Sequence, residues 1–179
     1  MNLEETISHW QRRDDNGFVE PWYVHPALDE IKTWELRGKK VFEWGMGLST
    51  LWWLSKGATV YCVDSNEEWY KAIAKKADEV FGQINNLHAT LAGGSDYVDI
   101  IKVHAPYDII VIDGVDRDEC CREVLKYLKP KGKLIIDNYL QPSVHVAPDW
   151  VREIVEVIPH TVYKHPTHDD WKTFIGTKP

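Results

Sequence analysis

The sequence has no block of lysines and arginines, no long apolar run and few cysteines. Its 21 basic and 28 acidic residues give a net charge of −7, which argues against general nucleic-acid binding because neutralising phosphates needs a basic face. No apolar run approaches the roughly 20 residues that span a membrane. The acidic start at Glu4 and Glu5 lacks an apolar segment, so we expect no secretory signal. Three cysteines without disulfide or metal spacing indicate reduced thiols, and we expect a cytoplasmic protein.

The length of 179 residues suits one domain with a substantial core. Residues 1–37 form a helical and irregular lead-in, with one short helix through Leu3, Ile7 and Trp10 and another over His25–Trp34. The core, residues 38–179, alternates apolar strands with amphipathic helices. The predicted strands are Lys40–Trp44, Thr59–Asp64, Leu87–Leu91, Tyr107–Asp113, Lys133–Asp137, Val155–Tyr163 and Trp171–Thr177.

Four predicted helices connect these strands. They cover Leu48–Lys56, the stretch after Ser65 (an N-cap, with Glu68 completing a capping box), Gly93–Val103, and a segment through Cys121 and Leu128 that ends at residues 129–132. A further helix is expected near Pro148–Glu153. Such alternation predicts an α/β fold, a mostly parallel seven-stranded sheet with helices on both faces. The last two strands, joined by a polar loop, predict an antiparallel C-terminal hairpin.

A glycine turn after the first strand is the most informative motif. Gly45 and Gly47 lie between a buried strand and a helix, and Asp64 ends the next strand 19 residues beyond Gly45. Glycines let a backbone approach a ligand closely, and a carboxylate at the second strand tip can accept both hydroxyls of a ribose. Thr50 replaces the third glycine of a dinucleotide motif. Glu43 at the base of the turn would repel a pyrophosphate but suits an ammonium or sulfonium group. The alternative is an ordinary turn whose glycines serve geometry alone.

These residues resemble the first two motifs of class I S-adenosylmethionine-dependent methyltransferases. The resemblance covers roughly residues 38–179 and implies a Rossmann-like methyltransferase fold. More narrowly, the stretch 42–53, Trp69-Tyr70, the Asp-Gly-x-x-Arg pattern at 113–117 and the pair Asp137-Asn138 look like a group of small bacterial and viral methyltransferase-like proteins. Members of that group are mostly of undefined substrate, so the resemblance implies a cofactor more firmly than a reaction.

The resemblance also implies roles for individual residues. Glu43 would bind the methionine ammonium, directly or through water, Gly45 and Gly47 would make the tight turn with Ser49 beside it, and Asp64 would hold the ribose. Ser65 or Trp69 would border the adenine, and Ser95 matches a region that usually touches adenine. Ser95 as a helix N-cap and Trp69 as a core residue are the alternatives.

Three oxygen donors near the fourth and fifth strands raise the question of magnesium. In catechol-type O-methyltransferases, an Asp after strand four and an Asp-Asn pair after strand five bind Mg²⁺, and Asp113, Asp137 and Asn138 match those places. Asp116 stands where those enzymes have a lysine base. The resemblance implies that Asp113 faces the methyl-transfer site. The alternative to a metal site, which we favour, is that Asp137 and Asn138 cap backbone amides while Asp113 binds and orients the cofactor.

The predicted function is transfer of a methyl group from S-adenosylmethionine to an oxygen or nitrogen of a small-molecule substrate. Asp113, Asp116 and His145 are the candidate catalytic residues. We expect substrate contacts from the lead-in around Trp22, Tyr23 and His25 and from residues 139–148, no membrane partner, and a homodimer as the candidate assembly. The alternatives are a catalytically silent domain with this fold and a nicotinamide-dependent oxidoreductase, which Glu43 and Thr50 disfavour.

Overall fold

The structure of the chain is a computed structural model that describes residues 12–83, 85–122, 124–141, 154 and 157–179. The predicted helix through Leu3, Ile7 and Trp10, the predicted helix at Pro148–Glu153, and His145 lie outside these residues. Seven strands form one sheet: β1 (Lys40–Trp44), β2 (Thr59–Asp64), β3 (Leu87–Leu91), β4 (Tyr107–Ile112), β5 (Leu128–Ile136), β6 (His160–Lys164) and β7 (Lys172–Thr177).

The order of the strands confirms the predicted fold class. The sheet runs β3-β2-β1-β4-β5-β7-β6. The first five strands along the chain pair in parallel, whereas β7 lies antiparallel to both β5 and β6. After β3 the chain returns to the middle of the sheet, where β4 lies beside β1. The strand order reverses between β1 and β4, and the carboxyl ends of both strands lie at the same edge of the sheet. Ligands of open α/β sheets bind at that edge.

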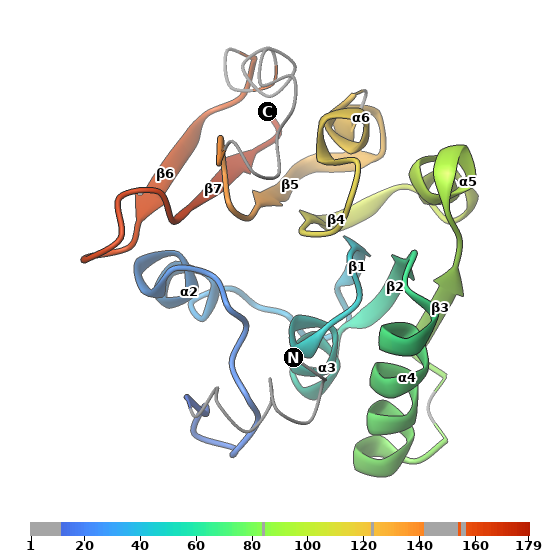
Figure 1. Cartoon of the computed structure of the whole chain (residues 1–179). Helices are drawn as coiled ribbons and strands as arrows, with labels where there is room; N and C mark the ends of the chain where they lie inside the picture. The colour runs from blue at the N-terminus through green and yellow to red at the C-terminus, as the bar shows by residue number, and fades with distance from the viewer. Residues whose placement is uncertain (1–11, 84, 123, 142–153, 155–156) are drawn as a thin grey trace.

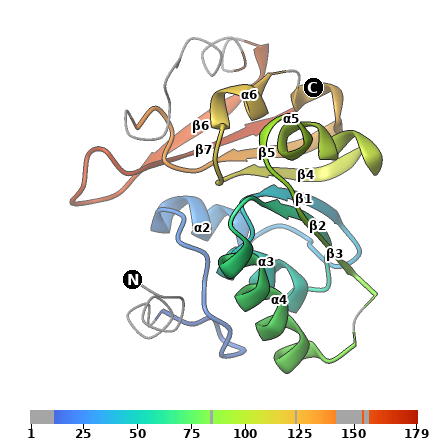
Figure 2. The same cartoon turned by 45° about the vertical axis from the view of Figure 1, so that its right-hand side comes forward.

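Helices cover both faces of the sheet. Figure 2 shows the sheet nearly edge-on, with α2 (His25–Ile31), α3 (Leu48–Ser55) and α4 (Glu67–Phe81) on one side and α5 (Gly94–Asp99) and α6 (Arg117–Cys121) on the other. One core cluster includes Leu28, Trp52 and Ile73 from the first group of helices, and the other includes Tyr97 and Cys120 from the second. The 3₁₀ helices η1 (Ile100–Val103) and η2 (Val124–Lys126) lengthen the second layer.

The lead-in is part of this core. Tyr23, Ala27, Leu28 and Ile31 are buried, because α2 packs its apolar side against β6 and β7 and the neighbouring α3 layer. Figure 1 shows α2 beneath the C-terminal strands, so segments far apart in the sequence lie side by side. No helix among the described residues is long and apolar enough to cross a membrane.

Three predicted local features are wrong. The N-cap of α4 is Asn66, whose side chain accepts the backbone N–H of Trp69 at 3.0 Å, and not Ser65. Leu128 begins β5, where it pairs with Tyr107, and does not end a helix, so the Lys-Pro-Lys-Gly segment that follows lies within the strand. Val157 is helical, which contradicts a strand beginning at Val155.

Candidate functional site

The turn after β1 lies directly against the loop after β4. Gly45 has a φ of +94°, and a Cβ added to it would lie 2.7 Å from the backbone nitrogen of Gly114. A Cβ added to Gly114 would lie 2.8 Å from the backbone nitrogen of Gly45 and 1.9 Å from the hydroxyl of Tyr97. Both positions therefore need glycine, the first for its backbone conformation and both for space. The two backbones together form the floor of a cavity at the carboxyl ends of the strands.

Asp64 forms the side of this cavity nearest β2. Its carboxylate accepts the backbone N–H of Met46 at 3.0 Å and that of Asn66 at 2.8 Å. Burial raises the pKa of Asp64, and the backbone donors partly oppose that rise. The backbone N–H of Ser65 also lowers the pKa of this carboxyl group. The carboxylate is thus held at the strand tip by backbone donors from the loops after β1 and β2.

Glu43 is completely buried below the turn. Ser49 Oγ donates to its Oε1 at 2.5 Å, and the Thr50 hydroxyl donates to its other oxygen. Thr50 Oγ1 in turn accepts the backbone N–H of Gly47 at 2.9 Å. Burial raises the pKa of Glu43 to about 8, although both hydroxyl donors lower it. Glu43 therefore braces the turn from beneath, and it reaches the cavity through Ser49.

The cavity has a volume of about 320 Å³, which is within the range of small-molecule sites, roughly 300–1,000 Å³. Seven of the residues predicted to bind the cofactor line it: Gly45, Gly47, Ser49, Asp64, Ser65, Trp69 and Asp113. The indole N–H of Trp69 donates to the carbonyl of Met46, which fixes its ring at one wall. Met46, Asn66, Tyr97 and Gly114 also line the cavity, although the sequence did not predict them as site residues.

Three predicted site residues lie elsewhere. Glu43 is beneath the turn, as described. Ser95 is exposed and does not line the cavity, and it is not an N-cap either, because Gly93 occupies that position in α5. Asp116 is exposed, in the left-handed backbone region at the start of α6, and it lines neither this cavity nor the second one described below.

Arg117 joins the loops that follow β4 and β5. Its guanidinium donates to the carbonyls of Gly114 at 2.8 Å, Asp137 at 2.6 Å and Asp113 at 3.0 Å, and to the Asp113 carboxylate at 3.1 Å. Arg117 is only 6% exposed. These hydrogen bonds are therefore shielded from water, which strengthens them. The arginine of the Asp-Gly-x-x-Arg pattern is thus a structural clamp of the site, a role that the sequence pattern did not reveal.

A second, smaller cavity lies on the other side of Trp22. It has a volume of about 40 Å³ and is lined by residues of the lead-in, the end of β5 and the β6–β7 hairpin: Trp22, Tyr23, Val24, His25, Asp137, Asn138, His165, Trp171 and Lys172. Trp22 lines both cavities. Of the lead-in residues expected from the sequence to contact substrate, Trp22 therefore lines the larger cavity, whereas Tyr23 and His25 line only the smaller one.

The magnesium candidates have other partners. Asp113 pairs with Arg117, and Asp137 accepts the Thr173 hydroxyl at 2.6 Å. Burial, and then the nearby Asp113, raises the pKa of Asp137. Asp113 lines the first cavity, whereas Asp137 and Asn138 line the second. Within the described part of the chain, no group of three or more His, Cys, Asp and Glu side chains is arranged to hold a metal ion.

Comparison with solved structures places this fold among known ones. The chain resembles magnesium protoporphyrin IX methyltransferase from Synechocystis PCC 6803 with bound S-adenosylmethionine (TM-score 0.64, 14% identity, covering 99% of this chain and 93% of that one). It also resembles precorrin 8W decarboxylase from Methanobacterium thermoautotrophicum (0.65, 16%, 94% and 96%). A third similar structure is an rRNA methylase from Streptococcus thermophilus (0.60, 17%, 79% and 87%). No protein-family model and no curated protein matches the sequence.

The chain therefore has the fold of class I S-adenosylmethionine-dependent methyltransferases. Its mostly parallel sheet with an antiparallel β7 between β5 and β6 is the arrangement that the resemblance implied. The likeness to these structures extends to the fold, and the activity follows as a proposal from the residues of the cavity.

Proposed function

We propose that the chain is a methyltransferase that binds S-adenosylmethionine in the larger cavity and methylates an oxygen or nitrogen of a small molecule. The position of Asp64 carries this proposal. Its carboxylate is fixed at the tip of β2 by Met46 and Asn66, beside the Gly45–Gly47 turn, and Asp64 lines the cavity. A ribose presents two neighbouring hydroxyls, which are the donors that such a carboxylate accepts.

The remaining lining suits the rest of the cofactor. The flat ring of Trp69 provides a wall for adenine. Gly45 and Gly47 allow close approach of the backbone, and Ser49, bonded to Glu43, presents a polar group to the methionine part. The carboxyl groups of Asp64 and Asp113, which line the cavity, favour a ligand that carries positive charge. Asp113 remains the candidate for the methyl-transfer side of the site.

S-adenosylmethionine supplies an activated methyl group on a positively charged sulfur. A lone pair of the acceptor oxygen or nitrogen forms the new bond to the methyl carbon. The carbon–sulfur bond breaks with its electron pair onto sulfur, and the acceptor gives its proton to a base or to water. The protein's part is orientation and exclusion of water. We assign no magnesium to Asp113, Asp137 and Asn138, because Asp113 lines one cavity and pairs with Arg117, whereas Asp137 and Asn138 line the other.

A small acceptor fits this chain better than nucleic acid. One similar structure is an rRNA methylase, but the net charge here is −7, and among the described residues the larger cavity is lined by Asp64 and Asp113 and by no lysine or arginine. Phosphates need cationic partners near the site. The alternatives of a silent domain and of a nicotinamide enzyme are outcomes of the test below.

Isothermal titration with S-adenosylhomocysteine and with NAD tests the proposal. Wild-type protein should bind S-adenosylhomocysteine in preference to NAD. Asp64→Ala should weaken that binding by about 1.5–3 kcal/mol, the scale for hydrogen bonds to a charged group. Asp78→Ala, an exposed aspartate on α4 away from the cavity, is the matched control and should bind normally. Absence of S-adenosylhomocysteine binding at millimolar ligand would reject the proposal. If Asp64→Ala weakened NAD binding by the same amount, the oxidoreductase would be favoured.

A further inference from the structure

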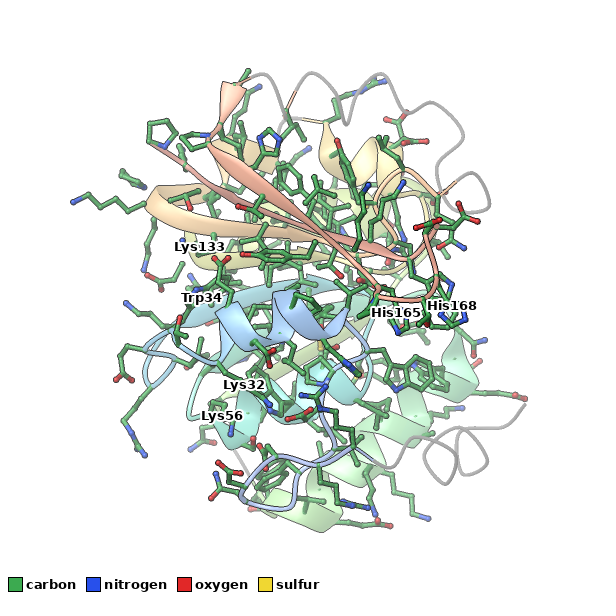
Figure 3. All side chains as sticks on the ribbon, turned by 90° about the vertical axis from the view of Figure 1, so that its left-hand side faces the viewer. Lys32, Trp34, Lys56, Lys133, His165 and His168 are labelled. Carbon is green, nitrogen blue, oxygen red and sulfur yellow. The ribbon has the colours of Figure 1, made fainter. Side chains whose placement is uncertain are left out.

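We propose that a third cavity, at the edge of the sheet opposite the cofactor cavity, binds a small phosphate monoester that carries an apolar group. The cavity has a volume of about 360 Å³, which is within the range of small-molecule sites, roughly 300–1,000 Å³. Its lining comes from the segment before β1 and from the amino-terminal parts of β4 and β5. Figure 3 shows Trp34 and Lys133, which both line it, at the opposite end of the sheet from His165 and His168 of the β6–β7 hairpin. The site is therefore separate from the proposed methyl-transfer site, and the inference goes beyond the proposed function.

Lysines dominate the charge of this cavity. Lys39, Lys131 and Lys133 line it, whereas the cofactor cavity is lined by Asp64 and Asp113. The ammonium groups of Lys39 and Lys131 form no hydrogen bond or ion pair with the residues that the structure describes. Their N–H donors are therefore available to a ligand. A phosphate monoester is the matching acceptor, because it carries a charge of about −1.5 to −2 at pH 7 and three strongly accepting oxygens.

Both acids in the lining already have donors. Asp108 accepts the Lys129 ammonium at 2.8 Å and the backbone N–H of Lys40 at 2.9 Å. Burial raises the pKa of Asp108, but the Lys129 ammonium and that N–H outweigh burial and hold the pKa below its usual value. Glu35 accepts the backbone N–H of Arg37 at 3.0 Å. Asp108 is thus ionised but balanced by Lys129, and the lysines in the lining leave the cavity positive overall.

Lys133 is fixed beside apolar surface. Its ammonium donates to Thr177 Oγ1 at 2.9 Å and lies 5.2 Å from the centre of the Trp34 ring. An ammonium has three N–H donors, so Lys133 can also donate to a ligand. Trp34, Ile109 and Pro130 contribute apolar surface to the same cavity. A ligand that joins a phosphate to an apolar group can therefore bind the lysines and bury its apolar part at once.

The backbone of Lys131 has an unusual conformation for a lysine. Its φ is +61°, in a region that glycine enters freely and other residues rarely adopt. Lys131 lies in the irregular stretch of β5 between Leu128 and Lys133, and its backbone N–H donates to the carbonyl of Lys178 at 2.9 Å. Irregularities of this kind redirect side chains, and backbone strain at a residue other than glycine gathers at functional sites. Contact with the phosphate is the function that we assign to the Lys131 side chain.

NMR titration with three probes tests the chemistry of the cavity. Phenyl phosphate, which has both a phosphate and an apolar ring, should bind. Inorganic phosphate and phenol each have one of the two groups and should bind at least about five-fold more weakly. Phenol that binds as tightly as phenyl phosphate would overturn the role of the lysines. Absence of phenyl phosphate binding at millimolar concentration would overturn the site itself.

Variants test the location. Lys131→Asn and Lys131→Gly remove the ammonium with residues that tolerate a positive φ, so both should fold and both should weaken phenyl phosphate binding by about five- to ten-fold. The melting temperature of Lys131→Gly should not fall, which separates lost binding from lost folding. Lys71→Gln is the matched control, because this exposed lysine of α4 pairs with Glu67 and lies outside the cavity. Unchanged binding in both Lys131 variants would overturn the location.

Trp34→Leu tests the apolar wall, because it keeps apolar bulk but removes the indole. It should reduce the preference for phenyl phosphate over inorganic phosphate, and an unchanged preference would overturn the role of Trp34. S-adenosylhomocysteine should not displace phenyl phosphate from the wild-type protein, because the two cavities lie at opposite edges of the sheet. Displacement would place the phosphate in the cofactor cavity and overturn the inference.

Discussion

The backbones of Gly45 and Gly114 are in such close contact that neither residue has room for a side chain. A Cβ on Gly45 would lie 2.7 Å from the nitrogen of Gly114, and a Cβ on Gly114 would lie 2.8 Å from the nitrogen of Gly45. This contact joins the β1 and β4 ends into one floor. The geometry of the proposed cofactor site therefore depends on two glycines that are 69 positions apart in the sequence.

Alanine at either glycine should destabilise the protein. We expect Gly45→Ala to cost roughly 2–4 kcal/mol, because it combines a clash with a positive φ, and Gly114→Ala to cost a similar amount by its clash with Tyr97. Gly93→Ala is the control, since a Cβ there meets nothing within 4 Å and its φ is negative. Urea unfolding measures the differences. Equal stability of all three variants would show that the two loops are not in contact.

Replacing Arg117 should release the loops after β4 and β5. Arg117→Lys keeps the charge but cannot donate to Gly114, Asp137 and Asp113 together. We expect a loss of about 3 kcal/mol, as for breaking a buried ion pair. Arg122→Lys, at an exposed arginine that pairs with Glu119, should change stability by less than about 0.5 kcal/mol. Chemical denaturation of both variants checks this. If Arg117→Lys had the same free energy of unfolding as wild type, Arg117 would not hold the two loops together.

Glu43 should make stability depend on pH. Burial raises its pKa in the folded protein from 4.5 to about 8, so the folded state binds more protons than the unfolded state between these values. Stability contributed through this group is therefore lost as pH rises from about 4.5 to about 8. Glu43→Gln removes the titrating group and keeps an oxygen acceptor for one of the two hydroxyls, Ser49 or Thr50. It should match wild type most closely at pH 5 and exceed it by on the order of 2 kcal/mol at pH 9.

The comparison must be made as a difference between variant and wild type, because Asp113 and Asp137 also have raised pKa values. Glu68→Gln, at an exposed position on α4, is the control and should show no pH-dependent difference. If the difference between Glu43→Gln and wild type were the same at pH 5, 7 and 9, Glu43 would not be the titrating group.

Divalent ions should have no effect on the folded protein. We expect thermal unfolding and S-adenosylhomocysteine affinity to be unchanged by millimolar magnesium or by a chelator. Asp137→Ala should lower the melting temperature, because it removes the acceptor of the Thr173 hydroxyl and so leaves a buried donor unpaired. That loss should be the same with and without magnesium. Stabilisation of wild type by magnesium that disappears in Asp137→Ala would instead identify a metal site.

The sequence predicted the first half of the core closely. The strand, glycine turn, helix and second strand around Gly45 and Asp64 have strong local signals, so β1, α3 and β2 begin where expected and end within one residue. The region before β5 was mispredicted for a physical reason. Tyr107 pairs with Leu128 but Ile109 pairs with Lys133, so β5 has extra residues opposite β4. Lys131, within this irregular stretch of the strand, has a positive φ. A Lys-Pro-Lys-Gly sequence is compatible both with the end of a helix and with an irregularity within a strand, so the sequence alone did not distinguish them.

Site residues could be predicted from the sequence where a local motif within one strand or turn identifies them. Ser49 and Asp64 follow from local motifs, and both line the cavity. Trp22 was expected near the substrate, but which cavity it lines, and the hydrogen bonds that Arg117 makes, depend on packing between distant segments. Periodicity and motif spacing carry no information about such contacts, because they arise from the arrangement of the whole sheet.

A crystal structure with S-adenosylhomocysteine tests the central claim most directly. We predict that both ribose hydroxyls contact Asp64, that the backbone of the Gly45–Gly47 turn lies against the ligand, and that the sulfur faces Asp113 with an open path to solvent. A ligand bound away from Asp64 would contradict the cofactor site. A sulfur sealed from solvent would contradict methyl transfer even with the cofactor in place.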